Sequence, residues 1–165
     1  MISIREMKAS DYQAIRNIYQ QGIDSNLCTF ETRVPSWEDF NRTHLPKPRL
    51  VAVDEHQQVC GFIILSPMSS RQCFRGVGEI SIYLDYRYRG QGIGTQLMNE
   101  MIKKSELCGI WSLFSGIFPE NKASLSLHKR CGFREVGYRE KLGESKDGTF
   151  KDVIFMERRS SIIGR

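Results

Sequence analysis

The sequence lacks any apolar run long enough to cross a lipid bilayer. Its apolar stretches, such as those at 62–65 and 80–84, are far shorter than the roughly 20 residues that a transmembrane helix needs. No basic segment followed by an apolar one, the pattern of a secretory leader, comes after Met1. We therefore expect a cytoplasmic protein with no membrane partner.

The cysteine and histidine spacing of a metal site is also missing. The five cysteines are widely separated, none forms a Cys-x-x-Cys pair, and the chain has only three histidines. We interpret the cysteines as free thiols, buried or partly buried, and predict no metal. They are Cys28, Cys60, Cys73, Cys108 and Cys131.

Linkers, internal repeats and low-complexity segments are absent as well. The chain has 165 residues, of which 40% are hydrophobic, 26% are charged and only five are proline. A chain of this length buries roughly 70% of the surface that it exposes when unfolded, so its core needs no disulfide or metal. These figures exclude a disordered or fibrous protein and predict one domain over residues 1–165.

The charge is moderately positive and spread along the chain. Lys and Arg number 24 against 19 Asp and Glu, which gives a net charge of +5. Such a charge can attract nucleic acid, a membrane face or a small polyanion, and solubility explains it equally well. No RNA-binding aromatic signature or helix-turn-helix pattern accompanies the basic residues, so we expect no nucleic-acid partner.

Hydrophobic periodicity predicts an α+β fold with a mixed sheet. We expect helices at about 10–22 and 122–131, one that Ser36 opens, and one after the glycine-rich turn at 90–94. The segment at 66–78 is expected to be irregular. The expected strands lie at about 2–7, 50–53, 59–65, 79–84, 110–114, 133–138 and 150–156.

The glycine-rich turn is the most informative segment. It reads Tyr88-Arg89-Gly90-Gln91-Gly92-Ile93-Gly94-Thr95 and connects a strand to a helix. Alternate glycines let the backbone approach a bulky group, and the first turn of the helix offers unpaired N–H donors, so a diphosphate fits. The spacing matches neither a dinucleotide fingerprint nor a P-loop. A flexible turn that needs several positive φ values is the alternative.

With its apolar strand, Arg89-x-x-Gly92-x-Gly94 resembles the acetyl-CoA loop of the GNAT family of N-acetyltransferases. A downstream segment resembles the second cofactor segment of that family: Asn121-x-x-Ser124-x-x-Leu127-His128-x-x-x-Gly132-Phe133. Three further segments resemble the phosphinothricin and methionine sulfoximine acetyltransferase branch. They are Thr29-Phe30-Glu31-Thr32, Val77-Gly78-Glu79-Ile80-Ser81-Ile82-Tyr83-Leu84 and Lys146-x-Gly148-x-Phe150-x-Asp152-Val153.

The resemblance implies the GNAT fold, a mixed and mostly antiparallel central sheet with helices on both faces and parallel strands that splay at the cofactor site. It also implies acetyl-CoA as co-substrate. The implied contacts are Ile82, Tyr83 and Leu84 with the pantetheine arm, Gly90, Gln91, Gly92, Ile93, Gly94 and Thr95 with the diphosphate, and Asn121 and Arg130 further along CoA. Asn121 as a helix cap and Arg130 as a solvated residue are the alternatives.

Acetyl transfer needs a neutral amine, whereas amines with a pKa of about 8 to 10.4 are mostly protonated near neutral pH. The resemblance implies that Glu79 is the general base, directly or through water, against the alternative of a solvent-facing side chain. The N–H near Leu84 can polarise the thioester carbonyl. His128, where many family members have Tyr, either protonates the departing thiolate or packs against the cofactor helix.

An amino-acid-like substrate needs a cation for its carboxylate, and arginine meets carboxylate or phosphinate with two hydrogen bonds. Two arginines just before Glu79 are the candidates, and three other residues complete the expected substrate wall. The segment 66–79 is shorter than in the branch, and Phe150 replaces a Trp often found there. The expected substrate residues are Phe30, Glu31, Arg71, Arg75 and Lys146.

These observations predict an enzyme that acetylates the α-amine of a small amino acid or toxic analogue by direct attack in a ternary complex. The resemblance also implies a homodimer. Within the same family, the acceptor can instead be a protein N-terminus, a lysine or a polyamine. A non-catalytic CoA-binding regulatory module and a basic nucleic-acid binder are the alternatives from other classes.

Overall fold

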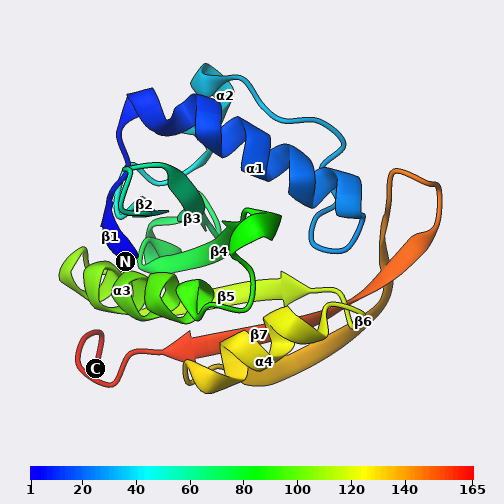
Figure 1. Ribbon diagram of the computed structural model, residues 1–165. Coiled ribbons are helices and arrows are strands. Elements are labelled where there is room, and N and C mark those ends of the chain that lie inside the picture. The colour runs from blue at the N-terminus through cyan, green and yellow to red at the C-terminus, as the bar shows by residue number, and fades with distance from the viewer.

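The computed structural model describes all residues from 1 to 165 and contains one seven-stranded sheet in the order β1-β2-β3-β4-β5-β7-β6 (Figure 1). Only β4 and β5 are parallel neighbours, so the sheet is mixed and mostly antiparallel. The predicted α+β fold class is confirmed. The strands are β1 (Ser3–Glu6), β2 (Leu50–Val53), β3 (Val59–Pro67), β4 (Val77–Leu84), β5 (Ser112–Ile117), β6 (Arg134–Glu144) and β7 (Phe150–Arg159).

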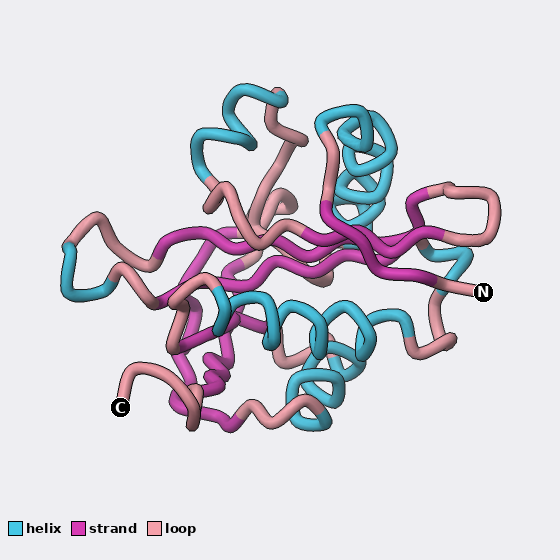
Figure 2. The backbone as a smooth tube through the Cα atoms, turned by 90° about the vertical axis from the view of Figure 1, so that its left-hand side faces the viewer, coloured by secondary structure: helices cyan, strands magenta, loops and turns pink.

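Helices cover both faces of the sheet (Figure 2). Helices α1 and α2 lie on one face, and α3 and α4 lie on the other (Figure 1). None of them combines the length and apolarity required to span a bilayer. The helices are α1 (Tyr12–Ser25), α2 (Trp37–Thr43), α3 (Ile93–Leu107) and α4 (Lys122–Arg130), with single 3-10 turns at Ala9–Asp11, Gln72–Phe74 and Tyr86–Tyr88.

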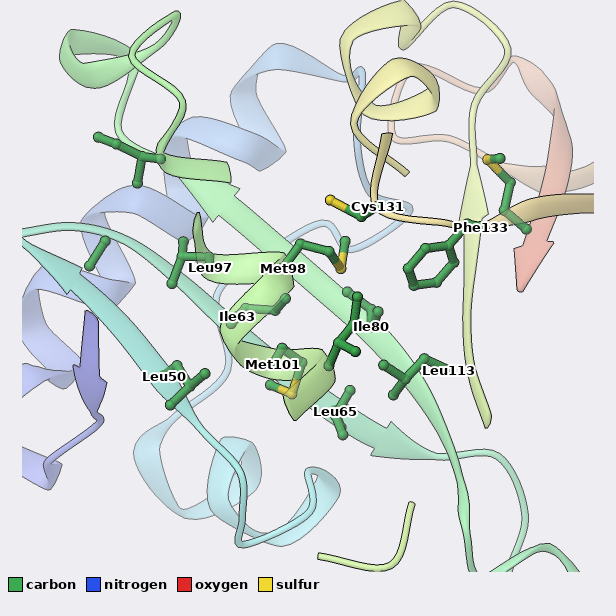
Figure 3. Close-up of a cluster of buried hydrophobic side chains, with 14 of the residues drawn as sticks. Leu50, Ile63, Leu65, Ile80, Leu97, Met98, Met101, Leu113, Cys131 and Phe133 are labelled. Atoms are coloured by element: carbon green, nitrogen blue, oxygen red, sulfur yellow. The ribbon is translucent and has the colours of Figure 1, made fainter. Parts of the chain in front are cut away.

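Alternation along β3 divides the core between the two faces. Phe62 and Ile64 pack with α1, whereas Ile63 and Leu65 pack with α3. All four side chains are fully buried, and each contributes about 1.5–3 kcal/mol by leaving water. On the α3 face, methionines of the helix point toward the sheet residues (Figure 3). The strand is apolar on both faces because both are covered.

Several predicted boundaries are wrong. The helix expected to end at Gly22 continues to Ser25 and is closed by Asn26 at φ 51°. The strand expected at 110–114 is Ser112–Ile117, because the N–H of Ile110 still bonds to Ser105 of α3. The strand expected at 133–138 extends to Glu144. The Ser36 cap is confirmed, since its hydroxyl accepts the N–H of Asp39 at 3.2 Å.

The parallel strands β4 and β5 stay together over a short distance only. Their ladder covers the three positions from Val77 to Glu79 on β4, opposite Ser112 to Phe114 on β5. Beyond Glu79, β4 remains paired with β3 and β5 remains paired with β7. The facing edges of β4 and β5 therefore separate, which matches the predicted splay and positions the site described below.

The start of β4 depends on a glycine that packs against a rigid ring. A Cβ added at Gly76 would lie 2.1 Å from the Trp111 ring, and Gly164 packs against the same tryptophan. Because the indole is confined, we expect Gly76→Ala to lower the free energy of unfolding by about 1–3 kcal/mol. Urea unfolding followed by circular dichroism measures this loss. Gly137→Ala is the control, since a Cβ there meets nothing within 4 Å, and equal midpoints for the two variants would contradict the packing argument.

Candidate active site

One large cavity of about 930 Å³ lies where β4 and β5 separate. It reaches from the glycine-rich turn, along β4 and the first turns of α3 and α4, to the segment after α1 and the β6–β7 hairpin. Its wall therefore combines segments that are far apart in the sequence. A cavity of this size can hold an elongated cofactor and a small second substrate.

The glycine-rich turn forms an open cradle at one end of the cavity. Gly90 and Gly92 both have φ 77°, and a Cβ at either would meet nothing within 4 Å. Helix α3 begins immediately after Gly92, and the first N–H groups of a helix lack intrahelical partners. The cradle thus combines free space with unpaired donors, which fits a diphosphate. Gln91 does not line the cavity, whereas its neighbours do.

Arg130 and Asn121 come to this region from α4. The guanidinium of Arg130 donates to Thr95 Oγ1 at 3.4 Å, so it lies beside the first turn of α3. Asn121 Oδ1 caps α4 by accepting the N–H of Ser124 at 3.2 Å. The cap alternative therefore holds for the Asn121 oxygen, although Asn121 also lines the cavity.

The β4 side of the cavity contains the predicted pantetheine residues Ile82, Tyr83 and Leu84. The Tyr83 ring packs against Tyr19 and Phe62, with centroids 5.0 and 5.2 Å away. Burial raises the pKa of its phenol well above the usual value, so the hydroxyl stays neutral. Because this ring is held in the core, the β4 backbone is the part of Tyr83 that is available to a ligand.

Glu79 stands on β4 at the point where the ladder to β5 ends. It pairs with Ser66 on β3 and with Phe114 on β5, and its side chain lines the cavity. The carboxylate forms no ion pair or side-chain hydrogen bond. Partial enclosure raises its pKa above the ordinary value. An accessible, unpaired carboxylate with a raised pKa is suited to accept a proton.

His128 on α4 is buried, and both of its ring nitrogens are engaged. Nδ1 lies 2.7 Å from the carbonyl oxygen of Ser124, and Nε2 lies 2.8 Å from the hydroxyl of Ser115. A carbonyl only accepts, so Nδ1 carries the proton and Nε2 accepts from Ser115. Burial lowers the pKa of the imidazole, which keeps it neutral. His128 has no N–H directed into the cavity, and this geometry favours the packing alternative over proton donation.

Two of the five expected substrate residues, Phe30 and Glu31, line the cavity. The other three do not line it. The guanidinium of Arg71 lies over the Phe74 ring at 5.4 Å, and that of Arg75 lies over the Trp111 ring at 5.3 Å. Both arginines are exposed and stack on these rings outside the cavity lining. Lys146 is exposed in the β6–β7 turn.

Several lining residues were missed by the sequence interpretation. They come mainly from β5 and the β6–β7 hairpin and make the far wall apolar. Alternation in β7 could have indicated two of them, since residues two apart share a face of a strand. Arg89 also lines the cavity, beside the glycines with which it forms a motif. The missed residues include Arg89, Ser115, Phe118, Leu142, Val153 and Phe155.

Comparison with known proteins identifies the family. The model of the acetyltransferase (GNAT) family matches residues 12–133. The chain belongs to the GNAT family. This GNAT chain is 31% identical to the L-methionine sulfoximine/L-methionine sulfone acetyltransferase of Pseudomonas aeruginosa, over 94% of this chain and 92% of the relative.

Two solved structures share the fold over nearly the whole length. The phosphinothricin acetyltransferase of Sinorhizobium meliloti, in complex with acetyl-CoA, has a TM-score of 0.86 at 28% identity, covering 96% of this chain and 88% of that one. The ribosomal-protein-alanine N-acetyltransferase of Brucella melitensis has a TM-score of 0.86 at 30% identity, covering 96% and 99%. This GNAT enzyme is an N-acetyltransferase that uses acetyl-CoA as co-substrate, and the open cradle fits that cofactor.

A methyl group in the cradle should weaken cofactor binding. Gly92→Ala adds a side chain on the open side of the turn and strains the backbone at φ 77°. We expect the Kd for CoA, measured by calorimetry, to rise by about tenfold or more, which corresponds to about 1.4 kcal/mol.

The matched control is Gly109→Ala at the other end of α3. Gly109 has φ 79°, and a Cβ there also meets nothing within 4 Å. This variant should suffer similar backbone strain and keep the wild-type Kd. Equal affinity losses in both variants would show that strain, and not the cradle, determines the effect.

Proposed function

We propose that this GNAT enzyme acetylates the primary amine of a small amino acid or of an analogue of the phosphinothricin and methionine sulfoximine type. The observation that carries the proposal is an unpaired carboxylate, Glu79, inside the cavity at the splay of β4 and β5. The names of the Pseudomonas aeruginosa and Sinorhizobium meliloti relatives support amino-acid-like acceptors.

Acetyl-CoA is assigned to the cavity with its diphosphate in the glycine cradle. In this assignment the backbone N–H groups at Gly92, Gly94 and Thr95 meet the diphosphate, and Arg130 adds positive charge beside them. The pantetheine arm follows the free edge of β4 from Leu84 toward Ile82, which leads the thioester toward Glu79. Acetyl-CoA supplies the activated acetyl group, and the chain supplies binding, orientation and a proton acceptor.

Glu79 accepts a proton from the acceptor ammonium, directly or through water. The neutral amine nitrogen then attacks the thioester carbonyl carbon, and the C–S bond breaks as the amide forms. A backbone N–H near Leu84 stabilises the charge that develops on the carbonyl oxygen. As the amide forms, the nitrogen loses a second proton, and the departing thiolate, whose thiol has a pKa of about 8.5, takes up this proton through water. No covalent acetyl-enzyme is needed.

We assign this activity to a single catalytic domain over residues 1–165 that works in the cytoplasm as a homodimer. The edge strand β6 supports the dimer, because it is exposed along nearly its whole length. Val136, Tyr138 and Phe150 are 45%, 58% and 60% exposed on the same hairpin. A long, partly apolar edge strand is a surface that pairs readily with a second copy.

Acetylation of a protein N-terminus is the second candidate function. The Brucella melitensis neighbour, named for ribosomal-protein alanine, favours it. A panel of acceptors separates the two, with free amino acids, methionine sulfone and phosphinothricin against alanine-initiated peptides. We expect kcat/KM for at least one free amino acid or analogue to exceed that for every peptide by about tenfold or more. A preference for peptides would select the second candidate, and acetyl-CoA binding without transfer to any acceptor would indicate a regulatory module.

Replacing the base should separate chemistry from binding. We expect Glu79→Gln to lower kcat by roughly 100- to 10,000-fold, because the amide cannot accept the proton. The Kd for CoA should stay at its wild-type value. Wild-type kcat in this variant would remove Glu79 from the mechanism.

The pH dependence of kcat tests the ionisation of Glu79 independently. Glu79 must be ionised to act as a base, and enclosure raises its pKa. Activity should therefore fall as the pH decreases through that raised pKa, at a higher pH than an ordinary glutamate would give. The residual activity of Glu79→Gln should not show this fall at low pH. An unchanged fall in the variant would mean that another group causes it.

A further inference from the structure

The hairpin of β6 and β7 contains a bulge, in which β6 has more residues than the facing part of β7. Between two paired positions β6 advances four residues, from Arg139 to Gly143, while the facing strand advances two, from Val153 to Lys151. Within the bulge Lys141 has φ 46°, in the left-handed region that non-glycine residues rarely adopt. Such a backbone conformation persists only when the surroundings support it.

The carboxylate of Asp152 on β7 supplies this support. Its Oδ1 accepts the N–H of Lys141 at 2.7 Å, and its Oδ2 accepts the hydroxyl of Tyr138. The Tyr138 and Lys141 hydrogen bonds, in that order of importance, lower the pKa of Asp152, so it is ionised at neutral pH. One side chain thus ties two positions of β6, Tyr138 in the paired part of the strand and the left-handed Lys141 within the bulge.

The end of the bulge forms part of the cavity wall. Leu142 lines the cavity, and Gly143 is so close to Phe30 that a Cβ would lie 2.6 Å from the ring. Phe30 in turn packs edge-on against Phe118, with centroids 4.8 Å apart. This apolar wall lies at the end of the cavity away from the glycine cradle. It is therefore the wall that an acceptor side chain meets.

The hairpin tip is anchored independently of the bulge. Asn26 at the end of α1 donates to Asp147 Oδ2 at 3.1 Å, and Lys151 donates to the backbone oxygen of Asn26. The hairpin turn and the end of α1 accordingly lie on the same side of the molecule (Figure 1). Because the tip has its own anchor, loss of the Asp152 contacts should alter the bulge without releasing the hairpin.

We propose that Asp152 is a positioning residue for acceptor selectivity, which acts by holding the bulge that sets Leu142 and Phe30 in the cavity wall. This inference rests on the proposed acetylation of a small amine. Asp152 does not itself line the cavity, so its effect passes through Leu142. Without the carboxylate the bulge relaxes, the wall recedes, and small acceptors lose contacts that larger ones keep.

The test measures kcat and KM for a small acceptor, alanine, and a larger one, methionine sulfone. In Asp152→Ala we expect the KM for alanine to rise about fivefold or more relative to that for methionine sulfone, with the KM for acetyl-CoA unchanged. Asp152→Asn retains an oxygen that accepts the Lys141 N–H and should recover most of the loss. Glu140→Ala, which removes an unpartnered carboxylate of the same bulge, should behave as wild type.

A double-variant cycle tests whether the effect passes through Leu142. In a Leu142→Ala background, Asp152→Ala should change selectivity much less than it does alone, because one of the two side chains that the bulge positions is gone. Additive effects of the two substitutions would overturn the inference. Sedimentation of every variant verifies that the oligomeric state is that of the wild type.

Amide hydrogen exchange keeps this inference separate from the proposed function. Asp152→Ala should speed exchange at Leu142 and Phe30, while exchange in α3 remains at the wild-type rate. If the wild type transfers acetyl to no amine, the proposed function fails, and the exchange result still decides the positioning role. Wild-type exchange at both residues, or wild-type selectivity in an active enzyme, would overturn it.

Discussion

The separation of two parallel strands is the constraint on which the site depends. β4 and β5 share a ladder of only three residue pairs, and each strand keeps its other partner after they part. Buried backbone N–H and C=O groups are almost always paired in folded proteins. The edge of β4 that faces the gap therefore presents groups that are free to bond to a ligand lying along it. A cofactor that occupies this gap supplies the partners that a continuing ladder would have supplied.

The other features of the site follow from this separation. Glu79 is the last β4 residue in the ladder, so its carboxylate lies at the start of the gap. At the opposite end of β4 the chain enters the glycine-rich turn and then α3, whose first N–H groups lack partners. One continuous strand thus fixes the distance between the glycine cradle and the Glu79 carboxylate. The core on both faces of β3 and β4 keeps that strand rigid.

Local features of the sequence predicted much of this arrangement. Short apolar periodic segments indicated the strands and helices, and the alternate glycines indicated the cradle, because both signals depend on neighbouring residues only. Ser36 was recognised as a cap for the same reason. The family resemblance supplied what local patterns cannot, namely the parallel pair that splays at the site. It also singled out Glu79, whose role as a base stays a prediction.

The parts that could not be predicted depend on contacts between distant segments. Arg71 and Arg75 were expected in the substrate site, but the direction of a flexible arginine is decided by rings such as Phe74 and Trp111 that the fold brings near. The bulge at Lys141 was also missed, since a left-handed lysine has no sequence signature. Its support comes from Asp152 on the opposite strand of the hairpin.

The most direct test of the central claim is amide hydrogen exchange along β4, measured with and without acetyl-CoA. If the cofactor replaces the missing ladder, acetyl-CoA should slow exchange at one or more of the amides from Ile80 to Leu84, together with those from Gly92 to Thr95. Free acetate at the same concentration should leave exchange unchanged. Protection confined to other parts of the chain, with β4 unaffected, would contradict the account.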